Sequence, residues 1–396
     1  MRKINLSNNA LQWLVVISIF QFRLETLVML LILLTTHRQG VLIYIRFAML
    51  LLIQSVVMLA LYGYGMSRPL QQLLLVGIHF IGYYTFFKSK VSSIDEVWIK
   101  YLKFCYYVAL LGVFQIICVL TVHVNPFEFL GSIRLSEDGG ISRLHSIFGE
   151  PGYLSVFLLP YIVYSISNFG TIDKKRFWVV LIVFLLTFGA AGYVGLFCFG
   201  IYKLMMSRLR LIPLILVPII LICSVVKLNR VDNDTQEGQM NDTLYKIRQT
   251  MDAFSLMEPV DFEVLNASTY ATMTNLWVSL NAPSRIVGTG IGSHPQTYER
   301  LYKSNFHLYG LNKEDAYSAA VRLYSEFGLF GLFIAFFLIF RYHNKANPIN
   351  VSILFYMVSC LVRGGHYTAN GIFFFCMIYY FSSHTNIQMQ KIDDIS

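Results

Sequence analysis

Residues 211–226 read LIPLILVPIILICSVV, and residues 227–234, which follow directly, read KLNRVDND. The first run is almost entirely apolar and approaches the length of a membrane-crossing helix, whereas the second is mostly polar. Polar and charged residues then continue to about residue 320, where another apolar run starts. A polar block of this size can fold in water. The rest of the chain is therefore expected to be arranged around this block, as helices in a membrane.

The composition agrees with this division. The chain has 396 residues, of which 56% are hydrophobic and 13% are charged, whereas soluble domains carry roughly 25% charged residues. In lipid, backbone N–H and C=O groups must find partners within the protein, so each apolar run is expected to be a helix. The sequence predicts an all-α polytopic membrane protein. The net charge of +9 does not indicate nucleic-acid binding, because the Lys and Arg residues cluster between the apolar runs.

Apolar runs recur along the chain and predict about twelve transmembrane helices, within a range of about 10 to 13. Only Gly189-Ala190-Ala191 separates two of the runs, which alternatively form one long helix. No small-residue cleavage site follows the first run, which is therefore expected to be a retained span and not a signal peptide. The expected spans are Leu11–Phe22, Leu27–Thr36, Val41–Tyr64, Leu70–Phe87, Lys103–Val122, Gly152–Asn168, Phe177–Phe188, Gly192–Met206, Leu211–Val226, Val321–Phe340, Val351–Leu361 and Gly371–Ser382.

Basic clusters between the spans predict the orientation of the chain. Twelve spans put both termini on one side, and six basic clusters fall on that same side. By the positive-inside rule this side is the cytoplasm. Arg23 and Arg68 fall on the opposite side, each as a lone charge in a short turn. The six clusters are Arg2/Lys3, His37/Arg38, Lys88/Lys90/Lys100, Lys174/Lys175/Arg176, Lys203/Arg208/Arg210 and Arg341/Lys345.

The polar segments divide the chain into five parts. Residues 1–122 hold the N-terminal transmembrane helices, residues 123–150 form a small outer loop, and residues 151–226 hold the central helices. Residues 227–320 form the large outer loop, and residues 321–396 hold the C-terminal helices and a short cytoplasmic tail. Both outer loops face away from the cytoplasm in this topology. We expect them to meet there and to form a site for a charged, lipid-linked substrate.

The small outer loop ends in a charged motif, Ser142-Arg143-Leu-His145-Ser-Ile-Phe-Gly149-Glu150-Pro151. Proline suits the first turn of a helix, and an acid at that end complements the helix dipole, so Glu150 is either a helix cap or a functional carboxylate. Arg143 lies beside His145 and Glu150 at the entry to a span. An arginine in this position can bind a diphosphate with two parallel hydrogen bonds.

A glycine-rich motif, Gly288-Thr-Gly290-Ile-Gly292-Ser-His294, lies within the large outer loop. It lacks the lysine and the preceding strand of a nucleotide-binding loop, so no nucleotide site is expected. Its functional interpretation is a tight turn that presents backbone N–H groups to an anion. His294 taken alone is expected to be a surface histidine, although it is also one candidate for a catalytic base.

A third group of charges lies where the large loop runs into the next span. Asp315, Arg322 and Glu326 are separated by seven and four residues, which places them near one face of a helix. A charge within lipid costs roughly 2.5–3.5 kcal/mol, so such residues usually face a cavity and serve a function. The alternative is a cluster at the membrane surface that extends toward water. Arg363 and His366 follow the penultimate span and are expected at the same end.

These motifs resemble those of a known family. The run from Arg143 to Pro151 is similar to the arginine–(few residues)–Phe–x–Glu–Pro signature of bacterial O-antigen and capsule polymerases of the Wzy type. The large outer loop with its glycine-rich motif, followed by RLYSEFGLFG at residues 322–331, fits the same family. The O-antigen ligases of this superfamily share the layout but carry a His-Asn pair where this chain reads about Tyr317-Ser318. The missing histidine weighs against a ligase.

The resemblance implies a polysaccharide polymerase in the plasma (bacterial inner) membrane, with many spans and both termini cytoplasmic. Such an enzyme joins oligosaccharide repeat units that are carried on undecaprenyl diphosphate, at the outer face of the membrane. The implied reaction is an inverting glycosyl transfer that uses neither a metal nor a cofactor. Beside the lipid bilayer, the implied partners are a chain-length regulator and a flippase of the same pathway.

The candidate site residues fall into three groups. Arginines would bind and neutralise the leaving diphosphate, one carboxylate or histidine would deprotonate the acceptor hydroxyl, and further groups would support them. The base is left open among three residues. In this order the groups are Arg143, Arg322 and Arg363; Glu150, Asp315 and His294; and His145, Glu326 and His366.

Other function classes make different demands on the sequence. A flippase for the same lipid-linked units suits about twelve spans, but carriers tend to show repeated halves, and this chain shows none. Loss of the arginines should leave single lipid-linked units outside the cell for a polymerase and inside for a flippase. A metal-dependent transferase needs converging carboxylates. In the outer loops, Asp232-Asn-Asp234 is the nearest approach to such a set.

Overall fold

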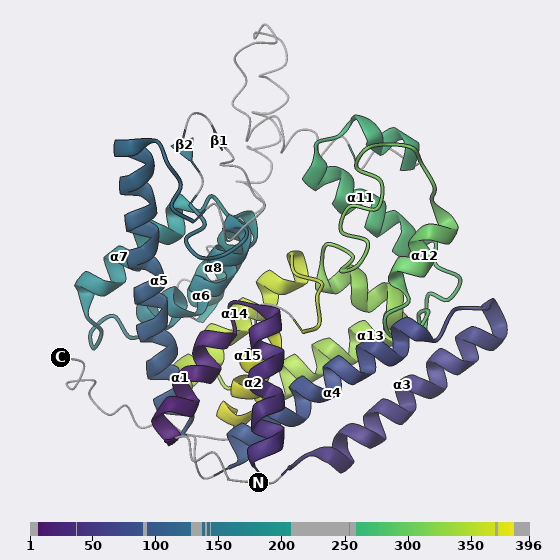
Figure 1. The fold of residues 1–396 in the computed structure, drawn as a ribbon, viewed down its shortest axis with the longest axis horizontal. Helices are drawn as coiled ribbons and strands as arrows, with labels where there is room; N and C mark the ends of the chain where they lie inside the picture. Colours follow the sequence, from purple (N-terminus) through teal and green to yellow (C-terminus); the bar gives the residue numbers. More distant parts are fainter. Residues whose placement is uncertain are drawn as a thin grey trace, which may run out of the picture.

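The computed structural model of the chain describes residues 7–36, 38–89, 93–127, 137–138, 141–142, 144–206, 253, 259–368 and 371–383. Over these residues the chain is helical, with one antiparallel pair of two-residue strands. In chain order the elements are α1 Asn8–Ser18, α2 Phe22–Thr35, α3 Val41–Tyr62, α4 Ser67–Lys88, α5 Ile94–Val122, β1 Glu137–Asp138, β2 Ile141–Ser142, α6 Pro151–Ser167, α7 Lys174–Leu186, α8 Ala190–Met206, the 3₁₀-helix η2 Pro259–Val264, α11 Ala267–Leu280, α12 His294–Leu301, α13 Ala319–Arg341, α14 Pro348–Val362 and α15 Ile372–Ser382 (Figure 1).

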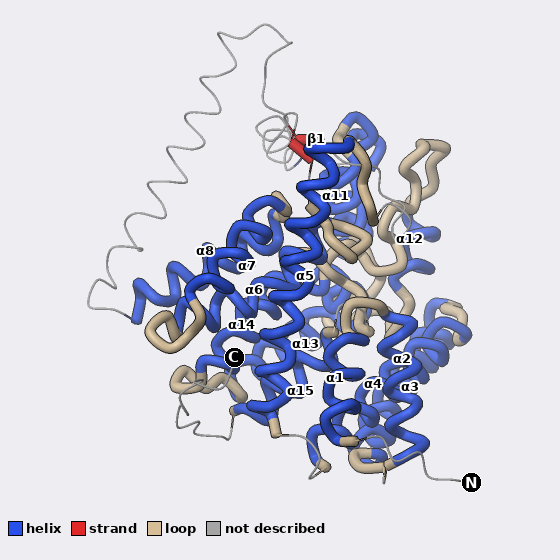
Figure 2. The backbone as a smooth tube through the Cα atoms, turned by 60° about the vertical axis from the view of Figure 1, so that its left-hand side comes forward, coloured by secondary structure: helices blue, strands red, loops and turns tan. Residues whose placement is uncertain are grey.

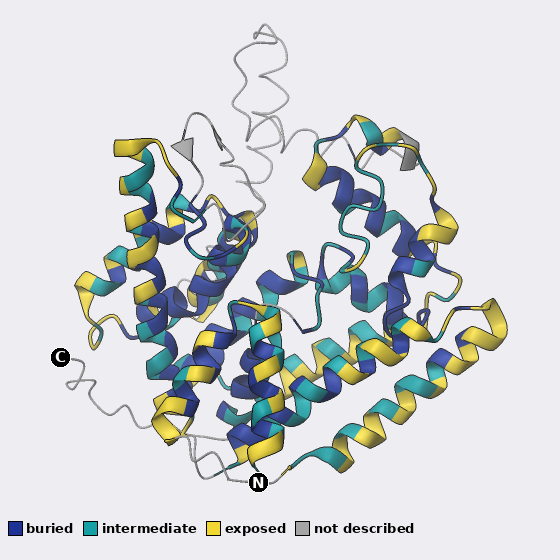
Figure 3. Cartoon of the chain, in the orientation of Figure 1, coloured by how far each residue is buried: buried dark blue, intermediate teal, exposed yellow. Residues whose placement is uncertain are grey.

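Four of the described helices, α3, α4, α5 and α13, are long and apolar enough to cross a membrane. The shortest of them has 22 residues, which corresponds to roughly 33 Å of helix against a hydrocarbon core of about 30 Å. The surface of α3 is largely uncovered (Figure 3). Its residues Leu42, Leu50 and Leu61 are 73%, 67% and 66% exposed, as expected for side chains that face lipid. These helices support a helical membrane protein.

The expectation of about twelve spans is not confirmed. Every expected span within the described residues coincides with a helix, and Leu211–Val226 lies outside them. However, the remaining apolar helices α6, α8, α14 and α15 have only 10–17 residues. The 11 residues of α15 extend over roughly 16 Å, about half of a hydrocarbon core. An apolar run therefore predicted a helix here, but not a helix long enough to cross lipid by itself.

The short helices arise where local packing interrupts an apolar run. α7 ends at Leu186, Phe188 adopts a left-handed backbone conformation (φ 48°), and α8 starts at Ala190. The two runs around Gly189 are thus two helices and not one. An added Cβ at Gly189 would lie 2.2 Å from the hydroxyl oxygen of Ser155. This close approach lets α8 pack against α6 and α14 while α7 packs against α5 and α6.

The core of the bundle lies around α6. This helix packs against α7, α8 and α14, and most of its residues are buried. Pro151 stands at its first position, where the N–H that proline lacks would have no helical partner. Aromatic rings fill the space between α5, α6 and α15. The ring of Tyr101 meets those of Phe157 and Phe375 edge-on, with centroids 5.5 and 5.3 Å apart.

The connections between helices gather at the two ends of the bundle (Figure 2). At one end, the turn between α3 and α4 contacts α12, where the Gly65 N–H donates to Gln296 Oε1 (2.9 Å). At the other end of α4, the Gln39 N–H donates to Thr85 Oγ1 (2.9 Å). The first end also holds the segments before α6, before α13 and after α14. Which end faces the cytoplasm stays a prediction, as do the five domain boundaries.

The described part of the large polar block, residues 259–318, forms a lobe beside α13 (Figure 1). η2, α11 and α12 enclose a small aromatic core, in which Tyr270 and Tyr298 are both 0% exposed. Arg300 of α12 donates to the carbonyl of Gly63 at the end of α3 (2.7 Å). The lobe therefore has a core of its own and is fastened to the α3–α4 turn by polar contacts.

Candidate functional site

The site is built around an interruption in α13. The helix breaks at Gly328 (φ 64°, ψ −161°), which leaves backbone N–H groups without their helical carbonyl partners. Carbonyl groups of the segment before α12 accept from these N–H groups instead. Leu329 N–H donates to Arg285 O (2.9 Å), and Phe330 N–H donates to Ile286 O (3.0 Å). An added Cβ at Gly328 would lie 2.3 Å from Ile286 O. Unwound backbone at membrane depth is tolerated where it is buried in protein or lines a cavity.

The glycine-rich motif lies along this interruption. Thr289 N–H donates to Ser325 O (3.0 Å), and Gly290 N–H donates to Glu326 O (2.8 Å). An added Cβ at Gly288 would lie 2.3 Å from the carbonyl carbon of Glu326. The motif is glycine-rich because its backbone touches the backbone of α13. The expected turn that presents N–H groups to an anion is therefore replaced by a packing element, because these two N–H groups already have partners.

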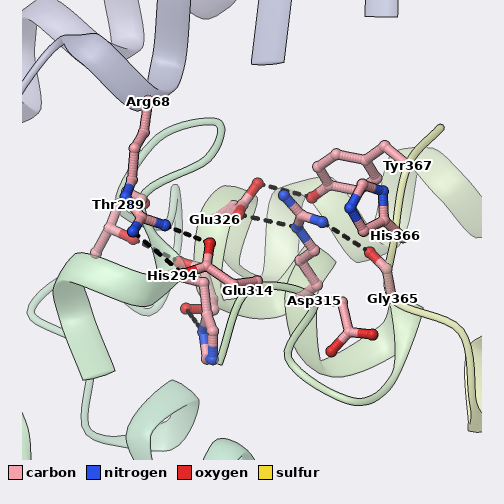
Figure 4. A network of polar contacts seen from close by, with 12 residues as sticks. Arg68, Thr289, His294, Glu314, Asp315, Glu326, Gly365, His366 and Tyr367 are labelled. Carbon is pink, nitrogen blue, oxygen red and sulfur yellow. Dashed lines mark hydrogen bonds and ion pairs between the residues drawn. The ribbon is translucent and has the colours of Figure 1, made fainter. Parts of the chain in front are cut away.

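Arg322 contacts Glu326, Gly365 and Tyr367, three residues that are labelled in Figure 4. Its side chain is 1% exposed. Nε donates to Glu326 Oε1 and Nη1 donates to Gly365 O, both at 3.0 Å. The guanidinium carbon lies 4.1 Å from the centre of the Tyr367 ring, and the Tyr367 hydroxyl donates to Glu326 Oε2 (2.8 Å). Glu326 is itself 0% exposed, so the buried positive charge is matched by a buried negative charge.

Asp315 lies in the turn before α13 and not on the helix, so the expected shared helical face holds only for Arg322 and Glu326. The turn is strained, because Ala316 and Tyr317 both adopt left-handed backbone angles (φ 56° and 64°). Such angles cost of order 1–3 kcal/mol each and collect at functional sites. Burial raises the pKa of the Asp315 carboxyl, while hydrogen bonding and nearby arginines lower it.

The strained turn is held by the segment that follows α14. Gly364 N–H donates to Tyr317 O (3.1 Å), and the Ser318 hydroxyl donates to Leu361 O (2.9 Å). An added Cβ at Gly365 would lie 1.6 Å from Asp315 O. This contact is closer than any side chain would permit. The start of α13 and the end of α14 therefore form one structural unit.

Glu150 and Arg363 form a second arginine–carboxylate pair, with 2.8 Å between Oε2 and Nη2. Glu150 is the residue before the first turn of α6, yet its side chain makes no capping hydrogen bond. The capping interpretation of this carboxylate is therefore not supported. The side chains are 34% and 30% exposed. The Arg363 guanidinium also lies over the Tyr317 ring, 5.1 Å from its centre, which links this pair to the strained turn.

His294 is 0% exposed, so the expectation of a surface histidine is wrong. Its Nδ1 lies 2.8 Å from Ser325 Oγ, and its Nε2 lies 2.9 Å from Asn275 Oδ1. The amide oxygen of Asn275 can only accept, so Nε2 carries the proton and Nδ1 accepts from the Ser325 hydroxyl. Burial, with a smaller contribution from Arg322, lowers the pKa of His294 to about 3. This imidazole is neutral and ties α11, α12 and α13 together.

His145 fixes the loop before α6 instead of facing the other candidates. It is 3% exposed. Its Nδ1 lies 2.8 Å from Phe148 O, and its Nε2 lies 2.9 Å from Asn125 Nδ2. The Gln115 side chain accepts from the backbone N–H groups of His145 and Ser146 (3.2 and 2.7 Å). Burial lowers the pKa of His145. Arg143, the third expected arginine, lies outside the described residues.

A cavity of about 370 Å³ opens beside Arg322, between α4, α12 and the segment after α14. His366 lines it, and burial with Arg322 lowers the pKa of His366 to about 4, so this ring is neutral near pH 7. Arg68 and Glu314 also line the cavity and form a two-point ion pair across it (Figure 4). The site thus combines buried charge, neutral imidazole and an exposed ion pair around one polar space.

Several residues of the network were missed from the sequence. Tyr367 directly follows His366. This position beside an expected site residue could have added Tyr367 to the candidate site. Gln54 donates to Glu326 O (2.9 Å). It could have been found from the sequence as a lone amide side chain within the apolar run of α3. Arg68 pairs with Glu314, a residue 246 positions away. No local pattern predicts a pairing over that distance.

The described residues include no group of three or more His, Cys, Asp or Glu side chains in an arrangement that could hold a metal ion. Asp232 and Asp234, the nearest approach to such a set in the sequence, lie outside the described residues. No family model, curated protein or solved structure matches the chain.

Proposed function

We propose that this chain is a polysaccharide polymerase of the plasma (bacterial inner) membrane, similar to the Wzy-type enzymes. It joins oligosaccharide repeat units carried on undecaprenyl diphosphate at the outer face, by a metal-independent inverting transfer. The observation that carries the proposal is the convergence of Arg322, Arg363 and Asp315 at one end of a bundle of apolar helices, where Arg322 also lines a polar cavity. Arginine suits a diphosphate leaving group, and a half-buried carboxylate with a raised pKa suits a base.

The proposed reaction is a single displacement at the donor sugar. A hydroxyl of the acceptor sugar attacks the anomeric carbon of the donor from the face opposite the diphosphate. The new carbon–oxygen bond forms as the bond to the diphosphate oxygen breaks, and undecaprenyl diphosphate leaves with that electron pair. The hydroxyl proton passes to the base. The reaction therefore inverts the anomeric carbon and consumes no cofactor.

Among the three candidate bases, the geometry favours Asp315. Burial raises the pKa of this carboxyl, which moves it toward the range where a carboxylate removes protons effectively near neutral pH. Both ring nitrogens of His294 are engaged in hydrogen bonds inside the protein. Glu150 is held by Arg363. Asp315 alone lies in a strained turn within the electrostatic reach of both Arg322 and Arg363.

The two arginines have different parts in this proposal. Arg322 is fixed by Glu326, Gly365 and Tyr367, and it holds a guanidinium, paired with Glu326, in the cavity wall. Arg363 is partly exposed, so a diphosphate can replace Glu150 as its partner at a cost of about 0–1 kcal/mol. Together they compensate the charge that develops on the leaving group.

The proposal is tested by replacing each arginine with lysine in cells that make the polymer. Lysine keeps the charge but lacks the planar fork that binds a diphosphate at two points. Arg322→Lys and Arg363→Lys should abolish polymer at normal protein level, with single lipid-linked units left on the outer face. Arg341→Lys, at the far and exposed end of α13, is the matched control and should leave polymer unchanged. Normal polymer from both site variants would contradict the proposal.

The interruption of α13 favours one competing function, a flippase for the same lipid-linked units. Interrupted membrane helices with charged groups beside the break are typical of the binding sites of transporters. The same arginine variants separate the two functions. Single units that accumulate on the cytoplasmic face would identify a flippase, because the defect would then precede translocation.

A further inference from the structure

The ion pair between Arg68 and Glu314 joins two distant parts of the chain in the lining of the cavity. Arg68 stands in the first turn of α4, and Glu314 lies in the loop before α13. Arg68 Nη1 donates to Glu314 Oε2 and Nη2 donates to Oε1, the latter at 3.1 Å. Two parallel hydrogen bonds of this kind are the geometry in which a guanidinium also binds a phosphate or diphosphate. The carboxylate thus occupies the fork that an anionic ligand would need.

The backbone of Arg68 is fixed, whereas its side chain is free to exchange partners. An added Cβ at Gly292 would lie 2.8 Å from Gln72 Cγ and 3.1 Å from Arg68 O, so the glycine-rich motif packs directly against the first turn of α4. The side chains of Arg68 and Glu314 are 35% and 58% exposed. A pair this exposed contributes little to stability and opens at small cost.

The surroundings of the fork favour an anion over a cation. Arg322 lines the same cavity with its charge paired to Glu326, and His366 adds a neutral imidazole that can donate a hydrogen bond. Gln71 and Gln72 supply further amide groups. Among the charged side chains that line the described cavity, Arg322 is paired with Glu326, so Arg68 is left as the unpaired positive charge once Glu314 turns toward water.

We infer that Arg68 is an anion-binding residue of this cavity, and that Glu314 is an internal competitor which a phosphate or diphosphate group displaces from it. The identification of the anion with the diphosphate of a lipid-linked glycan rests on the proposed function. The binding of the anion by Arg68 does not. In this arrangement Glu314 lowers the affinity for weak anionic ligands, and its release couples the loop before α13 to the occupancy of the cavity.

The inference is tested by binding measurements on the full chain in lipid nanodiscs, in excess chelator. One arm titrates inorganic pyrophosphate, and the other places undecaprenyl diphosphate in the bilayer. Glu314→Gln should tighten binding by up to about fivefold, because an exposed pair of this kind competes only weakly, and Arg68→Ala should weaken it by about tenfold or more. The arm that shows this pattern identifies the source of the anion.

The matched control is Glu299→Gln. Glu299 forms a similarly exposed pair with Lys313 (2.7 Å) that does not line this cavity, so its removal should not tighten binding. In the Arg68→Ala background, Glu314→Gln should have no further effect, because the competition needs the fork. If Arg68→Ala fails to fold, the comparison of Glu314→Gln with Glu299→Gln still tests whether Glu314 competes with the anion.

Equal effects of Glu314→Gln and Glu299→Gln in both arms would overturn the inference, as would unchanged binding by a folded Arg68→Ala variant. The proposed function would be wrong and this inference would stand if the protein made no polymer but bound the anion more tightly in Glu314→Gln. An Arg68→Ala variant that makes normal polymer and binds the anion as tightly as the wild type would remove this inference and leave the proposed function standing.

Discussion

Two arginine–carboxylate pairs of the same chemistry stand at the same end of the molecule in different surroundings. Arg322 and Glu326 are 1% and 0% exposed and 3.0 Å apart, whereas Arg363 and Glu150 are 30% and 34% exposed and 2.8 Å apart. The distances are nearly equal, so burial decides how the pairs differ. Breaking a buried pair costs about 3–5 kcal/mol, and breaking an exposed one about 0–1 kcal/mol. The first pair therefore belongs to the framework, and the second can exchange partners.

The largest effect is expected when the buried pair is broken. Glu326→Gln leaves the Arg322 charge buried without its counter-charge, and we expect the free energy of unfolding to fall by about 3–5 kcal/mol. The measurement is chemical unfolding in mixed micelles. A Glu326→Gln variant within about 1 kcal/mol of the wild type would show that the buried pair is not part of the framework.

A smaller loss is expected at the break in α13, which holds the buried pair in place. Gly328→Ala forces a side chain into a left-handed backbone position and sets its Cβ 2.3 Å from Ile286 O. We expect a loss of about 2–3 kcal/mol in the same unfolding measurement. The control is Gly200→Ala in α8, where an added Cβ meets nothing within 4 Å. There the change should be neutral or stabilising, because alanine favours a helix. Equal changes in the free energy of unfolding for Gly328→Ala and Gly200→Ala would show that the fold does not require the break at Gly328.

The pH dependence of the free energy of unfolding tests the buried region separately, because His294 lies within that region and titrates on unfolding. Its pKa is lowered from 6.5 to about 3 in the folded protein, so between these values the unfolded chain binds a proton that the folded chain does not. Stability is therefore lost as pH falls from about 6.5 toward 3, and this group contributes about 1 kcal/mol of that loss by pH 5.5.

The measurement for His294 compares unfolding free energies at pH 7.5 and pH 5.5. In His294→Gln the loss between the two pH values should be smaller than in the wild type by about 1 kcal/mol. Glutamine does not titrate in this range and can still hydrogen-bond to Ser325 or Asn275. An unchanged pH dependence in the variant would mean that His294 does not titrate on unfolding.

The smallest effect is expected at the exposed pair. Glu150→Gln removes the partner of Arg363, but water can solvate the freed guanidinium, so unfolding should change by less than about 1 kcal/mol. Chemical unfolding under the conditions used for Glu326→Gln makes the two values comparable. If Glu150→Gln lowered the free energy of unfolding as much as Glu326→Gln, the two pairs would not differ in their contribution to stability.

The sequence predicted the helical class and the placement of residues on one helix better than the long-range arrangement. Apolar runs mark the helices because lipid leaves the backbone few other options. Arg322 and Glu326 are four residues apart on one helix, so their shared helical face followed from helical spacing, whereas their ion pair was not predicted. The number of crossings did not follow, since breaks such as the one at Phe188 depend on packing against α6 and not on the run itself.

The parts of the site that the sequence did not predict depend on contacts between distant residues. Glu150 and Arg363 are 213 positions apart, and the alternative of a helix cap was open until the side chain could be located. The burial of His294 arises from Asn275 and Ser325, which come from two other helices. Charge and glycine patterns therefore marked segments that lie together in the structure, but not the partner of each residue.

The most direct test of the central claim is polymer formation by the purified full chain, supplied with the lipid-linked oligosaccharide in excess chelator. We predict that the wild type forms polymer under these conditions. Asp315→Asn should lose about 100-fold or more of the rate, because it removes the base and leaves the neighbouring arginines in place. Polymer formation by Asp315→Asn at the wild-type rate, or activity that disappears with chelator and returns with magnesium or manganese, would contradict the account.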